Sequence, residues 1–230
     1  HEIKESILFD GYNSNMNNWS IPNNNKVHFE INNGNYYLDH KRLKGGWSST
    51  LIKPINTSRD FKILADFKKE SGILNNGYGI AFGRRDSENQ NLFYINGNGS
   101  YQINKLRNNI DNFLKNWTPS SAIRKGNGET NVLKVVKIGS KLEYYINNIK
   151  VFTEYNPSFP GQRLGYILYD KQKISIAYLS VGYLDKKKFI TNTNNYKIEG
   201  NNNDPSNVAP SSNSIKNDYF NSNKNDWFTT

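Results

Sequence analysis

The sequence predicts an all-β protein that folds as a two-sheet antiparallel β-sandwich. About one residue in six is Asn, which favours turns and left-handed backbone positions and disfavours helix interiors. Between these turn signals, from about residue 7 to residue 183, runs of alternating, β-branched or aromatic residues recur without an intervening helix. Many short strands without helices are typical of sandwiches and jelly rolls.

Thirteen short runs are expected to be strands. They are Ile7–Phe9, Val27–Ile31, Asn35–Leu38, Trp47–Leu51, Phe61–Lys68, Tyr78–Arg84, Asn91–Ile95, Tyr101–Arg107, Val132–Ile138, Leu142–Ile146, Ile149–Thr153, Leu164–Tyr169 and Ile174–Val181. Two tight hairpins connect neighbouring runs, one at Asn33-Gly34 and one at Asn147-Asn148. Both dipeptides suit turns with positive φ, so these pairs of runs should be antiparallel neighbours.

One segment, Lys105–Trp117, carries a conflicting signal. Its apolar residues recur at helical spacing and would form one face of an amphipathic helix. Its many Asn residues are poor helix formers, however. We therefore expect a strand followed by a loop, with a helix as the open alternative.

Composition and charge narrow the partners. Hydrophobic residues make up 35% of the chain, and the formal charge is +10 with a pI near 9.5, which suggests nucleic acid or an acidic polysaccharide. The basic residues are scattered, with no run of five and no nucleic-acid motif. Solvated strand faces explain them better, so nucleic acid is not favoured. There is no Cys to form disulfides, and no 18-residue apolar stretch to span a membrane.

The chain is expected to contain one domain, a linker and part of a second domain. Residues 1–185 carry the strand pattern, and residues 186–214 form a polar Asn/Ser/Pro linker. Residues 215–230 become aromatic again: 218–227 reads DYFNSNKNDW, whereas 10–19 reads DGYNSNMNNW, with six of ten positions identical. We interpret this as a tandem repeat cut just inside its second unit, and the recurring Trp19 as a structural residue.

Several stretches together resemble a known group. They are Gly77–Arg84 (GYGIAFGR), Phe93–Ile95, Gly99–Lys105 (GSYQINK), Asn116–Ile123 (NWTPSSAI), Asn131–Val151, Gly165–Tyr169 and Ile174–Val181. The chain resembles bacterial concanavalin A-like jelly-roll modules of the laminin-G-like and 3-keto-disaccharide-hydrolase-like group over nearly all of residues 7–184. That resemblance implies a concanavalin A-like jelly roll. It leaves function open, because the superfamily includes lectins, glycosidases and adhesive modules.

The residues that would support catalysis or metal binding are sparse. Modules of this group often carry an Asp in the last strand, where this chain has Ala177. Glycosidases of this fold usually place paired carboxylates on alternate strand positions, and no strand here does so; Glu143 stands alone in its strand. His28 and His40 lack a partner at metal spacing, and the loop with Asp86 lacks a regular calcium pattern. We expect no catalytic residues and no cofactor or metal; a structural Ca²⁺ has no support in the sequence.

A set of aromatic, amide and basic residues in or beside the strands has the types that bind sugars. Sugar rings stack on aromatic rings, while amide and cationic side chains hydrogen-bond their hydroxyls. The predicted ligand-binding residues are Trp47, Arg84, Tyr94, Gln102, Asn104, Lys105 and Trp117. In Tyr78–Arg84, large residues alternate with Gly79, Ala81 and Gly83, which would give a flat floor for a ligand or would let a neighbouring segment approach closely.

Our leading hypothesis is a non-catalytic carbohydrate-binding or adhesive module in a multi-repeat bacterial protein, at the cell surface or secreted. The net charge favours an anionic polysaccharide as its ligand. A structural or protein-interaction module, with a protein or a neighbouring repeat as partner, is the alternative. A glycoside-processing hydrolase is the third, suggested by family analogy.

Overall fold

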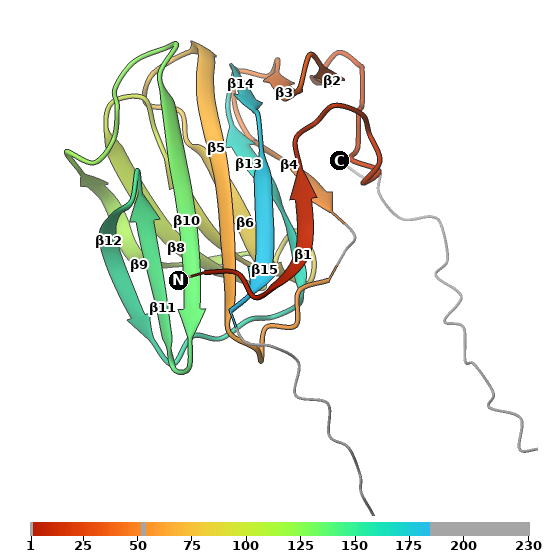
Figure 1. Ribbon diagram of the computed structural model, residues 1–230. Helices are drawn as coiled ribbons and strands as arrows, with labels where there is room; N and C mark the ends of the chain where they lie inside the picture. The colour runs from red at the N-terminus through yellow and green to blue at the C-terminus, as the bar shows by residue number, and fades with distance from the viewer. Residues whose placement is uncertain (1, 52–53, 185–230) are drawn as a thin grey trace, which may run out of the picture. The chain divides into compact units, whose positions relative to one another are not determined.

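The computed structural model describes residues 2–51 and 54–184, and in these residues the chain is all-β, with two antiparallel sheets packed face to face (Figure 1). The predicted two-sheet antiparallel sandwich is therefore confirmed. The predicted linker, 186–214, and the predicted start of a second repeat, 215–230, lie outside the described residues. Among residues 2–51 and 54–184 no helix has the length and apolarity that a membrane crossing requires.

Sheet A contains nine strands and lies in front in Figure 1. Its long central strand is β5 (Phe61–Gly72), which pairs with β10 along one side, and with β15 and then β14 along the other. The order is β12-β11-β10-β5-β14-β3-β2, with β15 also pairing β1. The strands are β1 (Glu5–Asp10), β2 (Val27–Asn32), β3 (Asn35–His40), β5 (Phe61–Gly72), β10 (Thr130–Ile138), β11 (Lys141–Ile146), β12 (Ile149–Tyr155), β14 (Gln172–Ile176) and β15 (Leu179–Tyr183).

Sheet B contains six strands and lies behind sheet A in the same view. Its order is β4-β13-β6-β7-β8-β9, so that β4 and β9 are its edges. The strands are β4 (Gly46–Leu51), β6 (Tyr78–Arg84), β7 (Gln90–Ile95), β8 (Ser100–Arg107), β9 (Ile110–Pro119) and β13 (Arg163–Tyr169).

The hydrophobic core lies between the two sheets and follows the alternation of the strands. Tyr78, Ile80 and Phe82 of β6 point into it from sheet B. Tyr144 of β11 enters it from sheet A, and its ring lies 5.2 Å from that of Phe93 on β7. Because successive side chains of a strand point to opposite faces, Gly79 and Ala81 belong to the face of sheet B turned away from the core.

The ambiguous segment folds differently from the expected strand and loop. β8 ends at Arg107, Asn108 and Asn109 make a tight turn with φ values of 49° and 62°, and β9 returns as a second strand. Two adjacent left-handed Asn residues are the usual chemistry of a two-residue hairpin. The register of β8 and β9 shifts twice between Tyr101 and Asn104. These bulges break the alternation of β9, which explains why its apolar spacing imitates a helix.

The predicted run Ile174–Val181 is two strands, not one. β14 ends at Ile176 and β15 begins at Leu179. Between them, the carboxylate Oδ1 of Asp66 accepts hydrogen bonds from the backbone N–H groups of Ala177 and Tyr178, at 2.8 and 2.9 Å. The Asp66 carboxylate thus bonds two backbone N–H groups that have no strand partner between β14 and β15. The chain can then move from one end of β5, where β14 pairs, to the other end, where β15 pairs.

The segment between β1 and β2 closes one end of the sandwich around Trp19. The indole of Trp19 is 2% exposed and stacks on Tyr166 with ring centroids 5.0 Å apart. Asp10 accepts hydrogen bonds from the Trp19 Nε1–H and the Asn17 amide, each at 2.8 Å, and the Asn15 side chain bonds the backbone of Trp19. The prediction that Trp19 is structural is confirmed.

Candidate functional site

The outer face of sheet B, turned away from the core, carries its own apolar cluster. Ala81, Leu92, Tyr94 and Ile167 form it, with Tyr169 packed against them. The strand register aligns these residues in rows across the sheet. Tyr94 lies opposite Gln102 on β8, and Leu92 lies opposite Asn104.

Three aromatic residues of this face lie against glycines that leave room for them. A Cβ atom on Gly79 would lie 2.7 Å from the Cα of Tyr94, and one on Gly46 would lie 2.8 Å from the ring of Tyr169. A Cβ atom on Gly77 would meet the indole of Trp117 at 3.1 Å. Of the small residues predicted from the β6 pattern, Gly79 lets the backbone and Cβ of Tyr94 approach closely, and it is Trp117, not the buried Tyr94, that reaches the surface.

The ring of Tyr94 contacts the rings of Trp117 and Tyr169. The Tyr94 centroid lies 5.5 Å from Trp117 and 5.7 Å from Tyr169. Burial raises the pKa of both phenols, that of Tyr169 to about 12. Both hydroxyls are therefore neutral at physiological pH and can donate hydrogen bonds. Trp117 is 40% exposed and brings the cluster to solvent.

Polar side chains from β8 and β9 lie beside these rings. Gln102 Nε2 donates to Asn116 Oδ1 at 2.7 Å. Asn104 donates to a carboxylate oxygen of Asp111 and accepts from the backbone N–H of Asn112 at 3.0 Å. We call the whole set the aromatic–amide patch: Tyr94, Gln102, Asn104, Asp111, Asn116, Trp117 and Tyr169.

The structure brings together four of the seven residues that the sequence suggested for ligand binding: Tyr94, Gln102, Asn104 and Trp117. Trp47 instead packs against the core between the sheets. Lys105 points toward sheet A, where its ammonium forms an ion pair with Glu154 of β12. Its position in β8 has the same parity as the core residue Ile103, so its side chain leaves the outer face.

The patch also includes residues that sequence reasoning missed. Asp111 and Asn116 belong to β9, which we expected to be a loop, and Tyr169 ends β13 on the other side of β6. The alternation of side chains along β13 could have identified Tyr169. Tyr166 and Leu168 point into the core, so Tyr169 points to the outer face.

Arg84 lies on the same outer face but at the opposite end of β6. Its side chain is 2% exposed, and its Nη1 donates to Ser48 Oγ of β4 at 2.6 Å. Burial, and to a lesser extent the nearby charge of Arg163, lowers the pKa of the guanidinium to about 10. The group remains a cation at neutral pH.

Glu143 of β11 and Asp66 of β5 are carboxylates held in structural contacts. Glu143 accepts from the Tyr145 hydroxyl and pairs with Lys150, and these hydrogen bonds lower its pKa. Burial raises the pKa of Asp66, whereas the two backbone N–H groups that it accepts oppose that shift. Within the described part of the chain, no three His, Asp or Glu side chains are grouped so that they could hold a metal ion.

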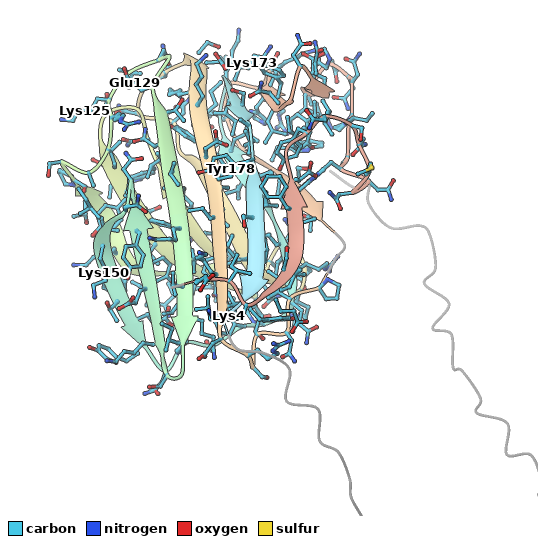
Figure 2. All side chains as sticks on the ribbon, viewed as in Figure 1. Lys4, Lys125, Glu129, Lys150, Lys173 and Tyr178 are labelled. Carbon is cyan, nitrogen blue, oxygen red and sulfur yellow. The ribbon has the colours of Figure 1, made fainter. Side chains whose placement is uncertain are left out.

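The outer face of sheet A differs from the outer face of sheet B because its cations are locally paired. Lys150 pairs with Glu143 at 3.1 Å, and Lys68 with Glu70 at 3.1 Å. Lys173 lies 4.8 Å from the centroid of the Tyr37 ring. Figure 2 views this face, with Lys150 and Lys173 toward its opposite ends. Such local pairs are typical of a solvated strand face, which is how we interpreted the scattered basic residues of the sequence.

The architecture is shared with solved β-sandwich domains. A Bacillus subtilis protein of unknown function with a galectin-like fold matches with a TM-score of 0.59 at 9% identity, over 79% of this chain and 97% of that chain. The fold is that of a galectin-like sandwich. The Emp47p carbohydrate recognition domain matches with a TM-score of 0.56 at 13% identity, over 80% of this chain and 99% of its own.

The CBM2 module of the evolved Dit of Lactobacillus casei BL23 phage J-1 also shares the architecture. It matches with a TM-score of 0.54 at 10% identity, over 80% of this chain and 98% of its own. No protein-family model and no curated protein match the sequence. At these identities the likeness concerns the fold of the galectin-like sandwich, so its function must be argued from its own residues.

Proposed function

We propose that this galectin-like sandwich is a non-catalytic carbohydrate-binding module, and that the aromatic–amide patch on the outer face of sheet B holds the glycan. The observation that carries the proposal is a cluster of three aromatic rings beside a row of amide groups on the adjacent strands. Aromatic rings supply the surface on which the C–H faces of a sugar stack, and a few placed polar groups fix its orientation. Two solved neighbours that share the fold are described as a carbohydrate recognition domain and a CBM2 module.

The polar groups of the patch have unused capacity for sugar hydroxyls. The Asn116 Oδ1 accepts from Gln102 and from the backbone N–H of Trp117, which leaves the Nδ2 of this exposed residue to donate to a sugar hydroxyl. Asp111 is exposed, and its second oxygen can accept from a hydroxyl. The arrangement binds and orients a ligand but contains no acid and base pair that would cleave it.

The sequence repeat adds a context to this proposal. Residues 218–227 repeat six of the ten residues of the segment that encloses Trp19. We propose that the module is one of several in a secreted or cell-surface bacterial protein of the laminin-G-like group. Linked modules bind a polymer more tightly than one module, because the second contact is intramolecular.

Replacing Trp117 with Ala should weaken glycan binding by about tenfold or more, because truncation of a central aromatic residue costs at least about 1.4 kcal/mol. A glycan array identifies the polysaccharide retained by the intact chain. Isothermal titration with an oligosaccharide of that polymer then compares the Kd of wild type and Trp117→Ala.

The matched control for this variant is Tyr155→Ala, which removes another exposed aromatic side chain, on β12 of sheet A. Its Kd should equal that of the wild type. Equal losses in both variants, or no glycan retained by the folded wild type, would contradict the proposal.

A protein-interaction module is a second candidate, favoured by the edge strand β9. Ile110 and Phe113 are exposed on this strand, beside Trp117. An exposed edge with apolar side chains is a template for pairing with another strand. If a second copy binds there, sedimentation velocity should show self-association that Ile110→Lys abolishes while glycan affinity is unchanged.

A further inference from the structure

The end of the outer face of sheet B opposite Trp117 holds two arginines side by side. A bulge in β6 places Arg84 opposite Arg163 of β13, and both lie on the side of the sheet that carries Ala81 and Gly165. Arg84 reaches across the sheet to Ser48 of β4. Gln90 of β7 belongs to the same end of this face, next to the row of Leu92.

Arg84 is a buried cation that forms no ion pair with a carboxylate of residues 2–51 or 54–184. Among the described residues its Nε has no hydrogen-bond partner, although the side chain is 98% buried. Asp86 is a minor favourable charge, and it is engaged with Arg85 and Asn89. A buried guanidinium that faces a second cation is costly unless an anion compensates it. The lowered pKa of Arg84 has the same origin.

An acceptor without a partner lies at the same end. Gln90 is buried, its Nε2 donates to the carbonyl of Ser87 at 2.9 Å, and its Oε1 has no partner among the described residues. A buried carboxamide oxygen of this kind needs a donor such as a hydroxyl. The site therefore offers donors for an anion and, beside them, an acceptor for a hydroxyl.

We propose that this end of the face, formed by Ser48, Arg84, Gln90 and Arg163, is a subsite for a uronic acid residue of the glycan. Arg84 and Arg163 bind the sugar carboxylate, because guanidinium groups hold carboxylates through paired hydrogen bonds. The Gln90 Oε1 accepts from the neighbouring ring hydroxyl. The carboxylate enters from the side of Arg163, which is only partly buried.

The two ends of the face would then bind one chain. From Gly77, which Trp117 covers and which directly precedes β6, to Arg84 at the end of β6 there are seven residue steps, or on the order of 20 Å at about 3.3 Å per residue. An oligosaccharide spans this distance, whereas a single sugar does not. This inference rests on the proposed function and adds the chemical class of the ligand, an acidic polysaccharide.

The test compares oligogalacturonate with its methyl ester, which has the same backbone but no charge. The wild type should bind the acid at least tenfold more tightly than the ester, and Arg84→Gln should bind the two equally. Arg85→Gln is the matched control: it removes the same charge at the next position, where Arg85 is exposed and paired with Asp86. It should keep the preference for the acid. If Arg84→Gln fails to fold, Arg163→Gln, at a less buried position, replaces it in the test and should reduce the preference for the acid.

The outcomes separate the two proposals. Equal binding of acid and ester by the wild type, still lost in Trp117→Ala, overturns the uronate subsite and leaves the glycan-binding function standing. Loss of the preference in Arg85→Gln as well as in Arg84→Gln shows non-specific attraction and also overturns the subsite. Tighter binding of a sulfated galactan than of oligogalacturonate assigns the arginines to sulfate and overturns the carboxylate. Failure to bind any of these glycans, or any on an array, overturns both proposals.

Discussion

Replacing Trp19 with Ala should lower the free energy of unfolding by about 4 kcal/mol, the largest loss expected from any single truncation in the galectin-like sandwich. The indole is 2% exposed and stacks on Tyr166, so its removal leaves a cavity where the segment after β1 closes the sandwich. It also leaves an Asp10 carboxylate oxygen without one of its two donors. Urea unfolding followed by circular dichroism measures the change.

Two further variants separate the contributions at this site. Trp19→Phe keeps a ring but removes the Nε1–H bond to Asp10, and should cost about 2 kcal/mol, since hydrogen bonds to charged groups are worth about 1.5–3 kcal/mol. Trp117→Ala removes an exposed indole and should cost less than about 1 kcal/mol. If Trp19→Ala were as stable as Trp117→Ala, the segment would not be the structural closure that we describe.

The strands were predictable where each alternates against one buried core. In β6, Tyr78, Ile80 and Phe82 alternate with small residues, and in the structure these three fill the core. β9 was not predictable from the same rule, because register shifts against β8 break its alternation and leave its apolar residues at spacings of three and four. A bulge depends on the partner strand, which a local pattern does not contain.

The candidate site was predictable in its residue types and only in part in its geometry. Tyr94, Gln102 and Asn104 were found because strand parity is local. The same alternation of side chains along β8 places Lys105 on the face of Ile103, toward the core, so Lys105 could have been excluded from the site. Asp111 joins the patch through the pairing of β8 with β9, and the relation of Arg84 to Ser48 depends on β4 lying two strands away in space. Such non-local relations follow from topology and not from residue spacing.

The segment around Trp19 shows what the structure adds to a sequence repeat. Asn matches in an Asn-rich chain carry little weight by themselves. Asn15 and Asn17 nevertheless make side-chain hydrogen bonds to Trp19 and Asp10, and both recur in residues 218–227 together with Asp and Trp. Four of the six residues retained in the repeat, Asp10, Asn15, Asn17 and Trp19, make the network. This coincidence favours the proposed second unit more strongly than the count of identities does.

Replacing Lys69 with Met should stabilise the protein by about 1–2 kcal/mol at pH 7 and remove part of its pH dependence. Lys69 is fully buried, its Nζ donates to Gln172 Oε1 at 2.7 Å, and burial lowers its pKa from 10.5 to about 8. A difference of this size costs about 3 kcal/mol when the group is charged in both states. Loss of the hydrogen bond to Gln172 offsets about 1–2 kcal/mol of the gain.

The sign of the pH dependence follows from proton binding. Between about pH 8 and pH 10.5 the unfolded chain holds a proton on Lys69 that the folded chain has released, so the free energy of unfolding rises with pH across this window. Below pH 8 both states are protonated and the full cost applies. The difference in unfolding free energy between Lys69→Met and wild type should therefore shrink as pH rises from 7 to 10. The control is Lys68→Met, at the adjacent exposed position, whose difference from wild type should stay constant over this range. A constant difference for Lys69→Met would contradict the prediction. It would mean that Lys69 stays charged in the folded protein, and that Gln172 and the Tyr78 ring, 5.4 Å away, compensate its burial.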